Sequence, residues 1–183
     1  MRRFALEDLC SVLNLPTEAK YDGTIERVAR AVRSLSTAPD EDVLLILRRA
    51  LFAWLIADGD MHLKNMAMLK ISEAGETRFS SVRVAPLYDA VTTRVFPRLE
   101  KDRMALKLNG KDDNLRRADF RTLATIAGIR SSDAYQNIDN LIVLLKDALD
   151  TIRPPGPLLL TEGAEAMFTK MLEICRQRLT SFD

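Results

Sequence analysis

Cysteine is scarce in this sequence. The two cysteines, Cys10 and Cys175, lie far apart, outside any C-x-x-C spacing and within apolar helical patterns. Such placement is not typical of a zinc site or of a disulfide framework. We therefore expect two buried, reduced thiols, as is usual in a reducing compartment.

Excess charge and long apolar runs are also missing. The net charge is +1, so composition gives no electrostatic reason to expect binding to nucleic acid or to an anionic membrane. No apolar run reaches the roughly 18 residues of a membrane span. Met1-Arg2-Arg3 leads into an amphipathic pattern instead of the apolar core of a signal peptide. We expect a cytoplasmic protein with no membrane partner.

Glycine is sparse and scattered. The seven glycines form no G-x-G and no G-x-x-x-x-G-K-[ST] motif, so the glycine-rich loops that cover nucleotide phosphates are absent. Of the 183 residues, 47% are hydrophobic and 29% charged, which is typical of a folded domain that buries roughly 70% of its unfolded surface. We predict one domain over residues 1–183, with N-terminal helices (3–57), a catalytic-loop and hairpin region (58–115) and a C-terminal helical bundle (116–183).

Apolar spacing predicts a mainly helical α+β fold. We expect helices over residues 4–13, 25–35, 43–57, 117–127, 132–152 and 162–181. The helix at 43–57 is apolar at thirteen of fifteen positions, a pattern typical of a central helix buried on several sides. Three carboxylates after Pro39 favour its start. Residues 14–23 form a predicted loop, Thr24 can cap the next helix, and Pro154-Pro155-Gly156-Pro157 is a predicted linker.

A β-hairpin is predicted after the central helix. Residues 66–71 and 79–85 flank a polar turn, and residues 104–108 are a candidate third strand. Antiparallel pairing brings the two ends of a hairpin together. Asn65 before the first strand and Asp89 after the second should therefore lie close, although 24 positions separate them.

The hexapeptide Asp60-Met61-His62-Leu63-Lys64-Asn65 carries the most specific chemistry. An Asp, an Asn five positions later and a downstream Asp form the spacing of kinase-type phosphoryl transfer. We predict that Asp60 takes the proton of the attacking hydroxyl. Asn65 and Asp89 would hold Mg²⁺ against the phosphates of ATP, because oxygen ligands suit this ion.

His62 and Lys64 complete the predicted catalytic group. His62 is the only histidine, and we expect it mainly to brace the loop, because Asp60 already suits the role of base. Lys64 either neutralises phosphate charge or points to solvent.

Neighbouring residues receive structural interpretations. Asp58 is expected in a solvated turn. Trp54 and Tyr88 are expected to pack in the core, as are three methionines, Met66, Met68 and Met104.

A kinase active site also needs a glycine-rich cover and a lysine from a strand-rich N-terminal lobe. No strand-rich segment precedes Asp60. We therefore expect this chain to correspond to a C-terminal lobe, with the N-terminal lobe supplied in cis or by a separate polypeptide.

Asp60 to Asn65, Ala85 to Asp89 and Met104 to Gly110 together resemble the C-terminal region of HipA-type serine/threonine kinases, the toxins of bacterial toxin–antitoxin pairs. The resemblance covers most of the chain, and its first two motifs are specific. It departs where only Gly23 follows Lys20-Tyr21 in place of Gly-Gly-Pro, and where Asp58 stands at a position commonly Asn.

The resemblance implies roles and partners. Asp60 would be the catalytic Asp, with Asn65 and Asp89 as magnesium ligands in a helical lobe around a small β element. ATP would be the donor, and the substrates would be proteins of translation such as aminoacyl-tRNA synthetases. The partner would be a helix-turn-helix antitoxin, through which the pair represses its operon, so that DNA is contacted only indirectly.

Two other functions stay open. Phosphoinositide kinases have a similar D-x-H-x-x-N loop, but the near-neutral charge weighs against a lipid substrate. A non-catalytic module that binds an antitoxin or operator complex is the second alternative. The presence of Asp60, Asn65 and Asp89 together weighs against it.

Overall fold

The computed structural model describes residues 2–154, 156 and 163–182. In chain order its elements are β1 (Arg3–Asp8), α1 (Leu9–Val12), η1 (Thr17–Tyr21), α2 (Ile25–Leu35), α3 (Pro39–Leu55), η2 (Leu63–Asn65), β2 (Ala67–Ser72), β3 (Ser81–Val84), η3 (Thr93–Val95), α4 (Arg117–Ile126), α5 (Ser131–Thr151) and α6 (Ala164–Phe182), where η denotes a 3₁₀-helix. The predicted mainly helical α+β class is confirmed. Two of the four residues of the predicted linker at 154–157, Pro155 and Pro157, lie outside the described residues.

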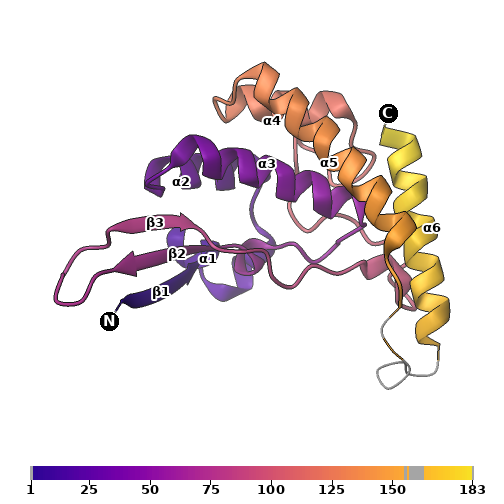
Figure 1. Cartoon of the computed structure of the whole chain (residues 1–183), viewed down its shortest axis with the longest axis horizontal. Helices are drawn as coiled ribbons and strands as arrows, with labels where there is room; N and C mark the ends of the chain where they lie inside the picture. The colour runs from indigo at the N-terminus through magenta and orange to yellow at the C-terminus, as the bar shows by residue number, and fades with distance from the viewer. Residues whose placement is uncertain (1, 155, 157–162, 183) are drawn as a thin grey trace.

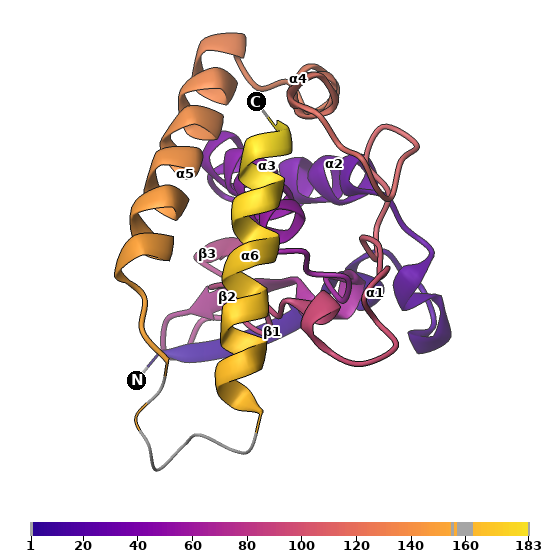
Figure 2. The same ribbon diagram turned by 90° about the vertical axis from the view of Figure 1, so that its right-hand side faces the viewer.

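Helix α3 is the centre of the fold. The sheet lies on one side of it and α4 and α5 lie on the other (Figure 1), while α6 crosses near its C-terminal end (Figure 2). Its apolar side chains are buried along most of its length, as its nearly uniform apolar sequence predicts. The central helix therefore gives the next segment of the chain a rigid support.

The C-terminal end of α3 turns sharply into the predicted catalytic hexapeptide. The Asp58 N–H donates to the Ala53 carbonyl at 2.8 Å and the Ala57 N–H donates to the Trp54 carbonyl at 3.2 Å. Ala57 has a φ of 56°. This is the Schellman arrangement, which usually places glycine in the left-handed position. It ends the helix at Leu55, four residues before Gly59, and directs the chain back toward the sheet.

The predicted helix at 4–13 is wrong. Residues 3–8 form strand β1, which pairs antiparallel with β2 and places Phe4 opposite Ile71. Only the segment after Asp8 is helical, and the Asp8 carboxylate caps it by accepting from the Ser11 N–H at 3.0 Å. The pairing with β2 overrides a helical pattern that was short and weak.

The predicted hairpin is confirmed as β2 and β3, but it belongs to a three-stranded sheet of order β1-β2-β3. The candidate strand at 104–108 is not part of this sheet. Its side chains Met104, Leu106 and Leu108 are buried, and it is held by a bridge between Thr24 and Lys107. Its alternating burial was predictable, whereas its bonding partner was not.

Other predictions are confirmed with small differences. Thr24 caps α2 by accepting from the Arg27 N–H at 3.2 Å, and Cys10 and Cys175 are buried free thiols. Trp54 and the three predicted core methionines are buried. The predicted loop at 14–23 contains η1. Among the described residues, no helix combines the length and apolar character that crossing a bilayer would require.

Asp42 joins the hairpin to α3. Its buried carboxylate accepts from the Val84 N–H at 2.9 Å and from the Arg83 Nε at 3.0 Å. The Ser36 hydroxyl donates to the same carboxylate at 2.6 Å. One side chain of the first turn of α3 thereby fixes the position of β3.

Replacing Asp42 by alanine should destabilise the fold strongly. Asp42→Ala leaves the Val84 N–H without its acceptor and the Arg83 guanidinium with Glu41 alone, which costs about 3 kcal/mol. Asp40→Ala is the matched control, because the Asp40 side chain is 88% exposed in its pair with Arg33, and its loss costs less than about 1 kcal/mol. Urea unfolding measures both free energies. Equal losses in the two variants would contradict the role given to Asp42.

Candidate active site

The hexapeptide forms a compact loop closed around one carbonyl. The Asp60 carbonyl accepts from the His62 N–H at 2.7 Å and from the Asn65 Nδ2 at 2.9 Å. Since its nitrogen is engaged, the Asn65 amide has a fixed orientation. Its oxygen has no hydrogen-bond partner within the described part of the chain. Because Asn65 follows Asp60 by five positions, its side chain reaches the Asp60 carbonyl and closes the loop.

The Asp60 carboxylate is partly exposed and held from one side. The Tyr21 hydroxyl donates to its Oδ1 at 3.0 Å. The His62 Nε2 lies 3.9 Å from the same oxygen. The side chain keeps 42% of its surface exposed. Asp60 is thus oriented without being enclosed, as a base that meets an external hydroxyl must be.

His62 lies under Tyr21 and is buried. The two rings meet edge to face, with centroids 5.2 Å apart. Burial lowers the pKa of His62 below its usual range, against the opposing effect of the Asp60 charge, so the imidazole is neutral at pH 7. Its Nδ1 has no hydrogen-bond partner among the described residues. This placement supports bracing, although the role of His62 stays a prediction.

Asp58 is not the solvated turn residue that was expected. It is only 3% exposed, and its carboxylate accepts from the Asp60 N–H at 2.9 Å. Burial raises the pKa of Asp58 to about 6, opposed by the N–H groups of Asp60 and Val91 and reinforced by the charges of Asp60 and Asp89. Asp58 therefore connects the hexapeptide to the segment that follows Asp89.

The open end of the hairpin carries Asp89. Met68 pairs with Val84 in the last residues of the ladder, and beyond it the Tyr88 hydroxyl donates to the Lys64 carbonyl at 2.9 Å. Tyr88 was expected in the core but is 36% exposed. Asp89 is exposed and has a φ of 55°, a left-handed conformation that Asp tolerates better than most residues. The chain thus returns beside the hexapeptide before Asp89.

Lys64 pairs with a carboxylate outside the hexapeptide, and its predicted role at the phosphates stays a prediction. Its Nζ lies 3.3 Å from the Asp8 Oδ2. Since Asp8 also caps α1, this ion pair joins the hexapeptide to the junction of β1 and α1.

The donor groups present fit a magnesium ion bound together with phosphate. Among the described residues, no three His, Cys, Asp or Glu side chains gather as a metal site. Magnesium needs fewer protein ligands, because it keeps waters and takes phosphate oxygens. Asn65 offers an amide oxygen held in place by the bond from its own nitrogen. Asp89 offers an exposed carboxylate that no described Lys or Arg pairs.

Sequence reasoning missed the side chains that support the site from a distance. Tyr21 is 39 positions from Asp60 and Asp8 is 56 positions from Lys64. No local pattern connects residues so far apart. The sequence Asp58-Gly59-Asp60 indicated a turn, but the environment of Asp58 also depends on the later segment at Val91.

Asp58 should impose a pH dependence on stability. Because its pKa is about 6 in the folded chain and near 3.9 when unfolded, the folded state binds more protons between these values. The free energy of unfolding therefore falls as pH rises from 4 to 6, by on the order of 2 kcal/mol. Asp58→Asn should lack this component, whereas Asp150→Asn, at a side chain 76% exposed, should keep it. Urea unfolding of the three proteins at pH 4.5 and 7 tests this; a constant difference between wild type and Asp58→Asn would refute it.

The chain is similar in sequence to a curated relative and in fold to a solved structure. The protein named "Putative kinase Y4mE" of Sinorhizobium fredii is 30% identical over 149 aligned residues, which cover 78% of this chain and 33% of that protein. The structure of Shewanella oneidensis HipA in complex with HipB and operator DNA superposes with a TM-score of 0.75 at 15% identity, covering 98% of this chain and 44% of that chain. The chain therefore spans about a third of its curated relative and less than half of the solved one.

The family comparison covers most of the chain. Residues 1–149 match the family described as HipA-like C-terminal domain. The match includes the hexapeptide, the hairpin and Asp89, and extends through most of α5. This chain belongs to the HipA-like C-terminal domain family.

Proposed function

We propose that this chain is the catalytic lobe of an ATP-dependent protein serine/threonine kinase. The observation that carries the proposal is the bond from the Asn65 Nδ2 to the Asp60 carbonyl. It joins the proposed base and a proposed magnesium ligand in one rigid loop, at the end of a hairpin that leads to Asp89. Family membership and the name of the Sinorhizobium fredii relative support a kinase. The hydroxyl specificity rests on the hexapeptide.

Asp60 would act on the acceptor. Its carboxylate accepts the proton of a serine or threonine hydroxyl while the hydroxyl oxygen bonds to the γ-phosphorus of ATP, and the bond from that phosphorus to the bridging oxygen breaks to leave ADP. The Tyr21 hydroxyl orients the carboxylate. Neutral His62 packs beneath Tyr21 and takes no proton in this scheme.

Asn65 and Asp89 would hold Mg²⁺ at the phosphates. The ion, when bound, neutralises phosphate charge during transfer. Asn65 contributes a fixed amide oxygen and Asp89 a carboxylate. Lys64 is engaged with Asp8 and supports the loop instead of contacting phosphate.

The remaining parts of the proposal come from the longer relatives. An N-terminal lobe, in cis or in trans, would supply the phosphate cover. A helix-turn-helix antitoxin would be the partner, because the Shewanella oneidensis relative is complexed with HipB and operator DNA. The acceptor would be a translation protein such as an aminoacyl-tRNA synthetase, with the chain acting as the catalytic part of a toxin.

Asp60→Asn should abolish phosphoryl transfer. The amide cannot take a proton, and loss of a positioned base costs roughly 10²–10⁴-fold in rate. The assay joins this chain to the N-terminal segment of a longer relative and measures transfer from labelled ATP to protein. Asp150→Asn on α5 is the control and should be fully active. Equal rates in Asp60→Asn and wild type would remove the assignment of Asp60.

Asp89→Asn should weaken magnesium binding at the phosphates. Losing a ligand carboxylate should raise the magnesium concentration for half-maximal transfer roughly 10–100-fold. Asn65→Ala should act in the same direction, whereas Asn140→Ala, at an exposed position on α5, should not. A magnesium titration of the transfer rate measures the effect, and an unchanged midpoint in both site variants would exclude these ligands.

A further inference from the structure

A cavity of about 580 Å³ lies directly beside Asp60. Its walls come from Tyr21 of η1, from the Gly59-Asp60 turn and from residues 91–105, which include Phe96, Leu99 and Asp102. The volume lies within the range of roughly 300–1,000 Å³ of ligand sites. Asp60, the proposed base, is one of its lining residues. The cavity therefore has room for more than the hydroxyl-bearing side chain.

Three large apolar side chains of this cavity are exposed. Tyr21, Phe96 and Leu99 expose 48%, 39% and 42% of their surface. They come from segments far apart in the sequence, yet they line one cavity. Clustered exposed aromatic and aliphatic groups are typical of binding surfaces, where they serve as anchors for a partner's apolar side chain.

The polar wall of the cavity carries uncompensated negative charge. Among the described residues, no Lys or Arg side chain pairs with the carboxylate of Asp60 or of Asp102. The one cation in the lining, Arg103, pairs with Asp112 at 3.2 Å. An incoming basic side chain would be attracted here and an acidic one repelled.

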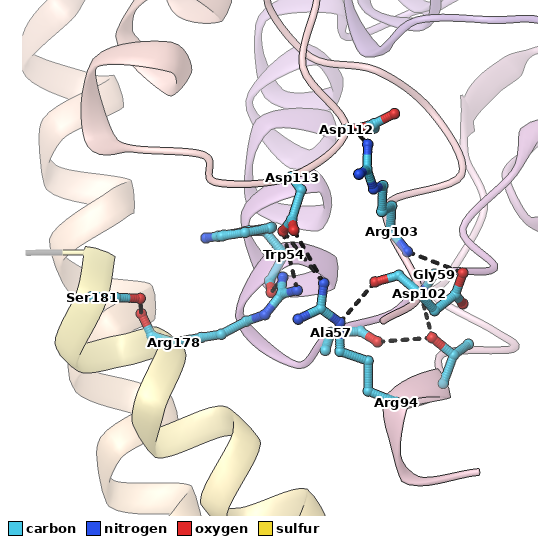
Figure 3. Close-up of polar contacts among 11 residues, drawn as sticks. Trp54, Ala57, Gly59, Arg94, Asp102, Arg103, Asp112, Asp113, Arg178 and Ser181 are labelled. Carbon is cyan, nitrogen blue, oxygen red and sulfur yellow. Dashed lines mark hydrogen bonds and ion pairs between the residues drawn. The ribbon is translucent and has the colours of Figure 1, made fainter. Parts of the chain in front are cut away.

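Arg94 holds the segment that carries Asp102 (Figure 3). The Arg94 Nε donates to the Asp102 carbonyl at 2.7 Å, and the Arg94 Nη2 lies 3.4 Å from Asp113. Asp102 also lies so close to Gly59 that an added Cβ there would meet its Oδ2 at 2.0 Å. The wall is therefore preorganised, which reduces the entropy lost on binding.

Helix α6 secures the same network. The Arg178 Nη1 donates to the Trp54 carbonyl at 2.6 Å, and its guanidinium lies 3.7 Å from the Trp54 ring centroid and 3.7 Å from Asp113. Burial lowers the pKa of Arg178 to about 10, so the group stays charged at pH 7. The arginines on both sides of Asp113 connect the cavity wall to the core.

We infer that this cavity selects the acceptor: an extended protein segment with a large apolar side chain next to the phosphorylated hydroxyl, and with a basic instead of an acidic residue nearby. The inference rests on the proposed kinase function and specifies its substrate class. Phe96, Leu99 and Tyr21 receive the apolar side chain. Asp102 receives the basic one, and Asp60 remains for the hydroxyl.

Peptide binding to the full chain tests the inference without catalysis. The probes are fluorescein-labelled peptides with one central serine followed by Leu and Arg, and variants with Asn in place of Leu or Glu in place of Arg. The Leu-Arg peptide should bind roughly tenfold tighter than either variant in fluorescence anisotropy. Equal affinities, or no binding of any peptide, would overturn the inference.

Substitutions of cavity residues test which side chains are responsible for the peptide preference. Leu99→Asn should remove the preference for Leu over Asn, while Leu144→Asn, at a leucine 57% exposed on α5, should preserve it. Asp102→Asn should remove the preference for Arg over Glu and leave the apolar preference intact, with Asp150→Asn as the control. Preferences that survive both Leu99→Asn and Asp102→Asn would place the peptide elsewhere and refute the assignment.

The two proposals fail separately. Selective peptide binding without phosphoryl transfer in the joined protein would retain the cavity and remove the kinase assignment. Transfer to both Leu-Arg and Asn-Glu peptides at equal rates would retain the kinase and remove the cavity as the selecting element.

Discussion

The burial of helix α3 is the constraint on which the rest of the structure depends. Because its surface is apolar nearly all round, the sheet must cover one side and the C-terminal helices the others (Figure 1). Its two ends then act as fixed reference points. Asp42 at one end positions β3, and the left-handed turn at Ala57 delivers Asp58 at the other. The hexapeptide and the hairpin are both attached to this one rigid helix, so their positions relative to each other are fixed.

The candidate site concentrates carboxylates that the fold does not neutralise. Asp60 and Asp89 both act on buried Asp58 and raise its pKa, and Asp102 lines the adjoining cavity without a cationic partner among the described residues. Backbone N–H groups stabilise Asp58, so the cost of this arrangement is reduced but not removed. Buried Asp119, by contrast, is paired with a lysine. Uncompensated charge gathered in one place is typical of a site that binds cations or cationic groups.

Sequence analysis predicted what depends on local spacing. The 3.6-residue period identified five of the six α-helices in the described part of the chain, and the D-x-H-x-x-N spacing identified a loop whose closure, Asn65 to the Asp60 carbonyl, is itself local. Sequence analysis failed where contacts with distant segments determine the local structure. The first strand owes its form to pairing with β2, and residues 104–108 bond to Thr24 instead of the sheet. Tyr21 reaches Asp60 only because the fold brings η1 and the hexapeptide together. The roles of the site residues themselves come from chemistry and stay predictions.

Helix α6 shows how a segment can shape a site to which it contributes no candidate residue. It begins at Ala164, beyond the 149 residues that the family comparison matches. Arg178 of α6 lies beside Asp113, Asp113 also pairs with Arg94, and Arg94 donates to the carbonyl of Asp102. The hexapeptide has its own supports in Tyr21 and Asp58. Arg178 also donates to the Trp54 carbonyl, which accepts the Ala57 N–H in the turn that leads into the hexapeptide. Helix α6 therefore contacts both the network behind Asp102 and the turn before Asp60, and a change at Arg178 can reach both through physical contacts.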